Sequence, residues 1–445
     1  MELASITQPS RTSPSIPPVV GADLLVPLAS GELIRYANLD HAASTPCLSA
    51  VQDAVNELLP WYASVHRGSG FASQVSSRVY ESARQVLRAF VGAPATASVV
   101  FTRNTTDALN LLAHSLPEAT TVVVFDTEHH AAMLPWRNPG TIRLQTPTSV
   151  DDTVGVLDTA LAAAPAGPRV VVLTGASNVT GELWPVAELA AVARRHGARV
   201  VLDAAQLAPH RPIDITAWQV DYVVLSGHKV YAPFGAGALI GPADWLRSAE
   251  PYLVGGGATA QVTQQPHELT ISWSDVPDRH EAGSPNVVGV HALAAACRAL
   301  TAHRDAIGAH EAELLRQLRN GLATVPGLAE LSLFGAPRVG VVSFAVERQD
   351  PGLLAAALSA EYGIGVREGA FCAHIATGRL LLRAGSAHQR AVRASLGLGN
   401  TVEDVERLVG ALHVLSARGP QLRYAHIGGQ WLPERDLRPW PAFAR

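Results

Sequence analysis

The chain has 445 residues, a net charge of −4, 48% hydrophobic residues and 16% charged residues. This composition is typical of a soluble globular protein of roughly two or three domains, and it offers no basic field for nucleic acid or an anionic membrane. No stretch approaches the ~20 apolar residues that cross a bilayer, and the three cysteines form no CxxC pair, so we expect a cytoplasmic protein with no metal site and no disulfide framework.

The N-terminal segment is rich in Ser and Pro and has neither a long apolar core nor a basic opening. This pattern predicts a flexible leader over residues 1–20 rather than a signal peptide.

The middle of the chain alternates between strand-like and helix-like patterns. Apolar, β-branched runs predict strands at 121–125, 169–175, 199–203, 222–227 and 237–241. Their nearly continuous hydrophobicity is typical of parallel strands that are covered on both faces. Ala/Leu-rich stretches with helical spacing, such as 186–196, lie between them. We therefore expect an α/β fold whose large domain, residues 21–304, holds a mostly parallel sheet flanked by helices.

Beyond residue 305 the pattern changes. Helical stretches at 310–322, 351–362 and 402–417 flank a strand-like run at 339–346. This arrangement predicts a smaller α+β C-terminal domain over residues 305–417, which the first residues of the large domain could also join. The Pro- and Trp-containing tail, residues 418–445, cannot form a long helix, and its aromatic residues predict packing onto the body or onto a partner.

An acid and a lysine follow two of the predicted strands. Asp203 ends one strand, and Lys229 follows the next strand in Ser226-Gly227-His228-Lys229. Ligands of open α/β sheets bind at the carboxyl ends of strands, so both side chains are expected at one site. An ordinary structural ion pair is the alternative explanation for such a pair taken alone.

The surrounding residues favour a site for pyridoxal 5′-phosphate (PLP). PLP chemistry needs an amine for the Schiff base, a carboxylate for the pyridine nitrogen, a phosphate cradle and a flat group that stacks on the ring. Thr105 and Thr106 begin a helical stretch after a predicted strand, although such a cap by itself only starts a helix. His129 is the stacking candidate. A zinc site at His129-His130 is excluded because adjacent residues do not share one face.

Motifs along the chain resemble those of class V aminotransferase-fold enzymes (PLP fold type I), specifically the cysteine desulfurase and selenocysteine lyase branch. The resemblance runs in order from about Leu39 to Leu408 and implies PLP as cofactor, an amino-acid substrate, a homodimer and a sulfur-acceptor protein. Its motifs include LDHAASTP, TRNTTDALNLLA, DTEHHAAMLPW, VVLDAAQLAPH, VLSGHKVYAPFGAGAL, RHEAGSPN and VREGAFCAH.

The resemblance assigns a role to each matching residue. Lys229 is similar to the lysine that forms the Schiff base, and Arg393 is similar to the arginine that clamps the substrate α-carboxylate. The cofactor-binding candidates are Thr105, Thr106, His129, Asp203, Gln206, Ser226, His228 and Ser284, of which Ser284 would reach the phosphate of the neighbouring subunit. The substrate-binding candidates are His66, Asn178, Arg367 and Arg393.

Cys372 decides which reaction the resemblance implies. It lies where desulfurases carry the cysteine that attacks the substrate sulfur, so the implied reaction is L-cysteine to L-alanine with the sulfur passed to Cys372. Ala370-Phe371 replaces the His pair that is usual in that branch. A small apolar role in the core is the alternative for a free cysteine.

Three other functions remain as alternatives. The same Lys229 site could serve as a C–S or selenocysteine lyase, an epimerase or an aminotransferase without a Cys372 persulfide. A non-catalytic binding protein with this fold is a second alternative. A nicotinamide enzyme is disfavoured, because Gly255-Gly256-Gly257 does not join a strand to a helix as the dinucleotide fingerprint requires.

Overall fold

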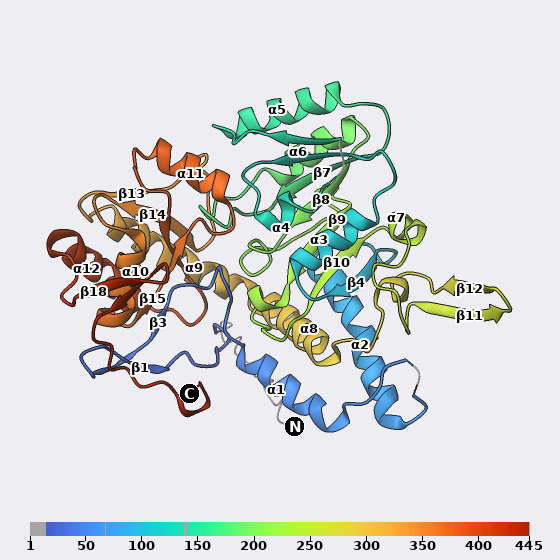
Figure 1. The fold of residues 1–445 in the computed structure, drawn as a ribbon, viewed down its shortest axis with the longest axis horizontal. Coiled ribbons are helices and arrows are strands. Elements are labelled where there is room, and N and C mark those ends of the chain that lie inside the picture. The colour runs from blue at the N-terminus through green and yellow to red at the C-terminus, as the bar shows by residue number, and fades with distance from the viewer. Residues whose placement is uncertain (1–14, 67, 138–139, 445) are drawn as a thin grey trace, which may run out of the picture.

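The computed structural model describes residues 15–66, 68–137 and 140–444. The chain forms two bodies, which appear in Figure 1 as a large sheet-and-helix layer and a smaller orange and red body beside it. Most of the predicted leader, residues 1–14, lies outside the described residues. Its remainder is packed on the large body, since Val19 is buried and forms a β-bridge with Leu48.

A seven-stranded sheet forms the centre of the large body, in the order β4-β10-β9-β8-β7-β5-β6. All of its strands are parallel except β10, which is antiparallel to both β4 and β9. The strands are β4 (Ser98–Thr102), β5 (Thr121–Phe125), β6 (Thr141–Leu144), β7 (Arg169–Thr174), β8 (Arg199–Asp203), β9 (Tyr222–Ser226) and β10 (Gly237–Gly241). The mostly parallel α/β sheet expected from the sequence is therefore confirmed.

The grouping of residues 237–241 with the parallel strands was wrong. Strand β10 follows β9 after residues 227–236. A parallel neighbour needs a crossover of about a dozen residues or more, usually with a helix, and this connection is shorter. The chain therefore turns back beside β9 and places β10 between β9 and β4.

Helices cover both faces of this sheet. In β7, Val170 and Val172 belong to the hydrophobic cluster that contains residues of α3, α4 and α7. Val171 and Leu173 belong instead to the cluster that contains α1, α2, α5, α6 and α8. This alternation is why the strands are apolar at every position. The helices are α1 (Ser49–Leu58), α2 (Phe71–Phe90), α3 (Thr105–His114), α4 (His130–Met133), α5 (Val150–Ala163), α6 (Val186–Arg195), α7 (Ala243–Ser248) and α8 (Val287–Ala302).

The small body has its own sheet and core. Its four-stranded sheet has the order β13-β14-β17-β16. Its buried cluster includes Ala37 and Leu39 from the start of the chain, because β3 (Ala37–Asn38) pairs with β15 (Ile364–Gly365). The other elements are β13 (Leu328–Glu330), β14 (Val341–Val346), β16 (Arg367–Gly369), β17 (Ala391–Ser395), α9 (Arg304–Leu322), α10 (Pro351–Tyr362), α11 (His374–Arg383) and α12 (Val402–Arg418). We propose the domain boundary near residue 304, at the break between α8 and α9.

Two hairpins stand out at the periphery. The hairpin of β11 (Thr259–Gln265) and β12 (Glu268–Trp273) projects from the large body at the right of Figure 1. The tail forms a second hairpin, β18 (Tyr424–Ile427) and β19 (Gln430–Pro433), and the Trp431 indole donates to the Asp350 carboxylate at 2.9 Å. The tail therefore packs onto the body. Within the described residues, no helix has the length and hydropathy to span a bilayer.

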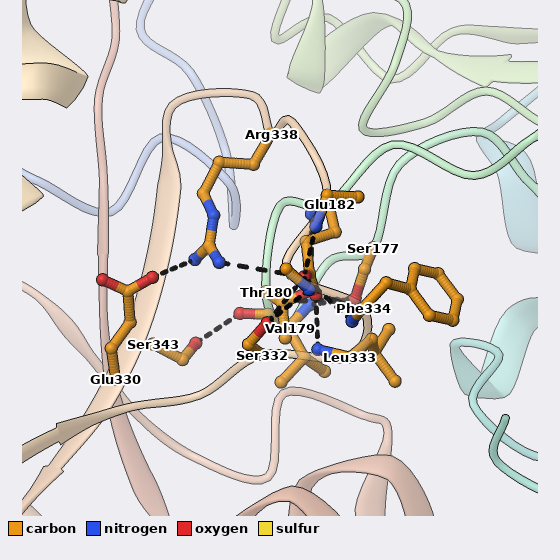
Figure 2. A network of polar contacts seen from close by, with 12 residues as sticks. Ser177, Val179, Thr180, Glu182, Glu330, Ser332, Leu333, Phe334, Arg338 and Ser343 are labelled. Atoms are coloured by element: carbon orange, nitrogen blue, oxygen red, sulfur yellow. Dashed lines mark hydrogen bonds and ion pairs between the residues drawn. The ribbon is translucent and has the colours of Figure 1, made fainter. Parts of the chain in front are cut away.

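A buried carboxylate joins the two bodies. Glu182, from the loop after β7, is fully buried and accepts hydrogen bonds from four consecutive backbone N–H groups at 333–336 and from the Ser332 hydroxyl (Figure 2). Burial alone would raise the pKa of Glu182, but these donors hold it below its ordinary value. Arg338 lies 3.9 Å from the same carboxylate and pairs with Glu330 at 2.8 Å.

The loop that carries Glu182 approaches the small sheet very closely. Gly181 has a φ of 75°, and a Cβ atom there would lie 2.5 Å from the carbonyl oxygen of Val341. Only glycine fits this position. Close to this contact, the Ser343 hydroxyl of β14 donates to the carbonyl oxygen of Val179 in the same loop (Figure 2). The junction between the bodies is thus made of backbone contacts and a buried charge.

Candidate functional site

One cavity of about 290 Å³ lies at the carboxyl ends of the large sheet's parallel strands, where small-ligand sites of this fold class occur. Its volume is near the lower end of typical ligand pockets, roughly 300–1,000 Å³. All but two of the predicted site residues line it. They are Thr105, Thr106, His129, Asn178, Asp203, Gln206, Ser226, His228, Lys229, Arg367, Cys372 and Arg393.

Lys229 ends the short 3-10 turn that follows β9. Burial lowers its pKa to about 8, and the nearby Arg393 charge acts in the same direction while the Asp203 charge opposes it. A substantial fraction of the amine is therefore neutral near physiological pH, as a nucleophilic lysine requires. Lys229 is also the only lysine in the whole sequence, a signal that motif analysis passed over.

Asp203 ends β8, next to β9 in the sheet. It is buried, one oxygen accepts from the Ala205 N–H at 2.9 Å, and burial raises its pKa. A cationic ring nitrogen in the cavity would reverse that shift, because an opposite charge stabilises the carboxylate.

A second buried acid, Glu128, lies near Asp203 and was missed from the sequence. One of its oxygens accepts from the Thr174 N–H at 3.1 Å, and the other has no hydrogen-bond partner among the described residues. Burial and the Asp203 charge raise the pKa of Glu128 well above its ordinary value. Burial thus favours the neutral form of Glu128, and the neighbouring Asp203 carboxylate adds to this effect. The signal was available, since Glu128 precedes His129 in the quoted motif.

The start of α3 offers an anion cradle. The Asn104 side chain caps the helix by accepting from the Asp107 N–H, and the Ser226 hydroxyl bonds both the N–H and the hydroxyl of Thr105 at 2.8 Å. Gly237 allows this approach, since a Cβ atom there would lie 2.8 Å from the Cα of Asn104. Backbone N–H groups and hydroxyls at a helix N-terminus form a suitable phosphate site.

His129 lies at the N-terminus of α4. Its Nδ1 accepts from the Ala131 N–H at 3.0 Å, so the neutral ring carries its proton on Nε2. Burial and the Lys229 charge lower its pKa to about 4. The imidazole is therefore a neutral, flat ring on the cavity wall at neutral pH.

Arg393 is buried on β17 and brings the small body into the cavity. Its guanidinium pairs with Asp40 at 3.2 Å, donates to the carbonyl oxygen of Asn178 at 2.9 Å, and leaves its buried Nε without a partner among the described residues. This unpaired donor suits an incoming carboxylate. The sequence identified Arg393 but not Asp40, although Asp40 lies in the quoted LDHAASTP motif. Gln206 is fixed separately, by donating to the carbonyl oxygen of Ala42 at 2.7 Å.

Cys372 is exposed at the mouth of the same cavity. It and Phe371 both have left-handed backbone conformations, with φ of 54° and 53°, which are strained for residues with side chains. Two hydrogen bonds hold this turn: His130 N–H to the Cys372 carbonyl at 2.8 Å, and the Asn178 amide to the Phe371 carbonyl at 2.7 Å. The loop is thus fixed to the large body.

His66 and Ser284 do not line this cavity. They line a separate hollow of about 490 Å³ together with Gly256 and Gly257. His66 pairs with Glu81 at 2.9 Å. Within one chain, the other predicted residues therefore share the first cavity, and His66 and Ser284 lie outside it.

Comparison with known proteins agrees with this geometry. The family model of class-V aminotransferases matches residues 37–408. A cysteine desulfurase of Enterobacter sp. (strain 638) is 36% identical over 85% of this chain and 93% of its own length. A probable cysteine desulfurase of Vibrio cholerae is 33% identical over 87% of this chain and 94% of its own.

Solved structures give the same result. The apo structure of a cysteine desulfurase from Thermococcus onnurineus NA1 matches with a TM-score of 0.75 and 29% identity, over 86% of this chain and 95% of that one. A cysteine desulfurase from Escherichia coli matches with a TM-score of 0.72 and 29% identity, over 85% of this chain and 94% of that one. The predicted fold class and family resemblance are confirmed: this chain belongs to the class-V aminotransferase family and is similar to cysteine desulfurases over most of its length.

Proposed function

We propose that this protein is a PLP-dependent cysteine desulfurase, which converts L-cysteine to L-alanine and passes the sulfur to Cys372. The observation that carries the proposal is a single cavity that holds the sole lysine, a buried acid, an arginine with an unpaired donor and, at its mouth, an exposed cysteine. The similarity to cysteine desulfurases supports the same reaction.

The residues present fit the chemistry of PLP. Lys229 would be the covalent attachment point, Asp203 would pair with the ring nitrogen and Gln206 would bond the ring hydroxyl. His129 would stack on the ring. Thr105, Thr106, Ser226 and His228 would hold the phosphate. When bound, PLP supplies an electron sink conjugated to the α-carbon of the amino acid.

The substrate is held by its carboxylate. Arg393 provides planar guanidinium donors for it, and Asn178 provides an amide beside them. Arg367 lines the same part of the cavity. In the structure Asp40 occupies one side of Arg393, so the substrate carboxylate competes with Asp40 for these donors. The Arg393 guanidinium therefore favours amino acids with a free α-carboxylate, which can replace Asp40 at its donors.

The protein moves protons at two positions. Lys229, whose pKa of about 8 leaves part of the amine neutral, takes and returns the proton at the α-carbon. Cys372 attacks the substrate sulfur as a thiolate. One proton leaves the Cys372 thiol and one is added to the substrate carbon, so the reaction needs no external oxidant.

The test of this function is a comparison of amino acids with the purified, PLP-loaded protein. We expect L-cysteine to yield L-alanine and an extra sulfur atom on the peptide that contains Cys372, read by mass spectrometry. Pyruvate, a racemised substrate or an amino-group transfer product in place of these would replace the desulfurase proposal with one of the other reactions of the Lys229 site.

We also propose that the protein works as a homodimer in the cytoplasm and delivers its sulfur to an acceptor protein. His66 and Ser284 lie outside the cavity of their own chain, and the family resemblance implies that Ser284 reaches the partner's phosphate. Cys372 is exposed, as transfer to another protein requires.

Light scattering at micromolar concentration is expected to give the mass of a dimer, the commonest closed assembly. Ser284→Ala is expected to weaken PLP retention about tenfold to a hundredfold, the loss of roughly one hydrogen bond to a charged group. A monomer that turns over L-cysteine would contradict the proposal.

A further inference from the structure

Two imidazoles from distant parts of the chain meet beside Cys372. His130 begins α4 and His374 begins α11. Their rings are nearly parallel, with an interplanar angle of 7° and centroids 5.0 Å apart, and His374 Nδ1 lies 3.3 Å from His130 Nε2. One nitrogen of this contact must donate and the other accept, so the two rings share a proton position.

The pair is attached to the cysteine turn from both sides. The backbone N–H of His130 donates to the carbonyl oxygen of Cys372, and His374 follows Cys372 by two residues. Helix α11 is in turn fixed to the large body, because Arg379 pairs with Asp126 at 2.6 Å. The imidazoles and the thiol-bearing residue are therefore held in one rigid arrangement.

The two rings differ in their exposure to solvent. His130 is half-buried, whereas His374 is exposed. Burial and the neighbouring His374 lower the pKa of His130. Several of the charged groups on the neighbouring elements are cationic. They are Lys229, Arg367 and Arg393, which line the cavity, and Arg379, which is paired with the carboxylate of Asp126. The nearby His129 ring is neutral at neutral pH.

We propose that the His130–His374 pair is the base that accepts the thiol proton of Cys372. This role rests on the proposed desulfurase function and replaces the His pair that is absent at Ala370-Phe371. The S–H bond of Cys372 breaks and its proton goes to the imidazole pair. The thiolate forms a bond to the substrate sulfur, the carbon–sulfur bond breaks with its electrons left on carbon, and a proton on that carbon completes L-alanine.

The test measures the thiol directly, before any turnover. Cys372 in the substrate-free holoenzyme is alkylated with iodoacetamide at a series of pH values, and peptide mass separates its product from those of Cys47 and Cys297. We expect His374→Ala to move the alkylation midpoint to higher pH and to slow persulfide formation from L-cysteine about a hundredfold, at the lower end of the range of general-base effects.

Three comparisons make this test specific. His374→Phe keeps a flat ring for stacking but cannot take a proton, so it is expected to behave like His374→Ala. Ile375→Ala, an exposed neighbour on α11, is the matched control and is expected to keep the wild-type profile. Free imidazole in the buffer is expected to restore the persulfide rate of His374→Ala, because the site of the lost ring is open to solvent.

The outcomes separate the two proposals. If His374→Ala, His374→Phe and Ile375→Ala share one alkylation profile and one persulfide rate, the imidazole pair is structural and the base assignment is overturned. If wild type forms no persulfide from L-cysteine, the desulfurase function is overturned. The alkylation profile still decides in that case whether the pair takes the thiol proton.

Discussion

Replacement of Lys229 by alanine is expected to lower the turnover of L-cysteine by about 10³-fold or more. The substitution removes both the covalent attachment of PLP and the group that moves the α-proton, and each contributes a large factor. Borohydride treatment of the wild type is expected to fix PLP on the peptide that contains Lys229. The site of attachment can be assigned without ambiguity, because the chain contains no other lysine that could react with PLP.

The pH dependence of PLP incorporation follows from the pKa of Lys229. Only the neutral amine reacts with the cofactor aldehyde, and the folded protein holds that pKa near 8. The rate of incorporation into apo-protein is therefore expected to rise about tenfold per pH unit below 8 and to level off above it. A rise that continues to pH 10 would indicate an unshifted lysine.

Lys229→Arg is the control that separates the positive charge of Lys229 from its role as a nucleophile. Arginine keeps a cation opposite Asp203 but cannot serve as the nucleophile at neutral pH. It is expected to preserve folding and to remain as inactive as alanine. Turnover by Lys229→Arg at a rate close to wild type would end the PLP-lysine assignment.

Substitution of Cys372 by alanine is expected to stop persulfide formation and to lower L-alanine production about 10²-fold or more. The thiolate is the acceptor that breaks the carbon–sulfur bond, and no other described cysteine lines the cavity. PLP retention and L-cysteine binding are expected to stay at wild-type levels, because they depend on Lys229, Asp203 and Arg393. Absorbance titration and alanine analysis of the same samples check both statements.

Cys47→Ala is the matched control for this variant. Cys47 is partly buried, and its thiol donates to the carbonyl oxygen of Leu48, so it is expected to be dispensable for turnover. If Cys372→Ala yields L-alanine as fast as Cys47→Ala does, the thiol does not accept sulfur. The Lys229 site would then belong to a lyase, an epimerase or an aminotransferase.

Much of the large sheet could be predicted because its signals are local. The run at 121–125 and the run at 199–203 coincide with β5 and β8, since a strand buried on both faces must be apolar at every residue. Asp203 and Lys229 could be identified for the same reason, as polar residues directly after such runs. The direction of β10 was missed because it follows from the short connection over residues 227–236 and not from the composition of the strand itself.

The remaining site features depend on contacts between distant residues. Asp40 meets Arg393 only because β3 joins the small body's core, and His130 meets His374 only because α11 lies against the large body. Glu182 is one acid among many in the sequence until the backbone at 333–336 surrounds it. No periodicity or spacing indicates such pairings, so they required the structure.

The loop over residues 176–183 has a consequence for how substrate enters. It contacts the small body through Asn178, Val179, Gly181 and Glu182. Separation of the two bodies would therefore break the hydrogen bonds that the Glu182 carboxylate accepts. Net contributions of hydrogen bonds to a charged group are about 1.5–3 kcal/mol each, so losing several of them together is expected to keep an open form a minor population. Cysteine is therefore expected to enter the cavity, and alanine to leave it, without separation of the two bodies. The route is the mouth of the cavity at the exposed Cys372.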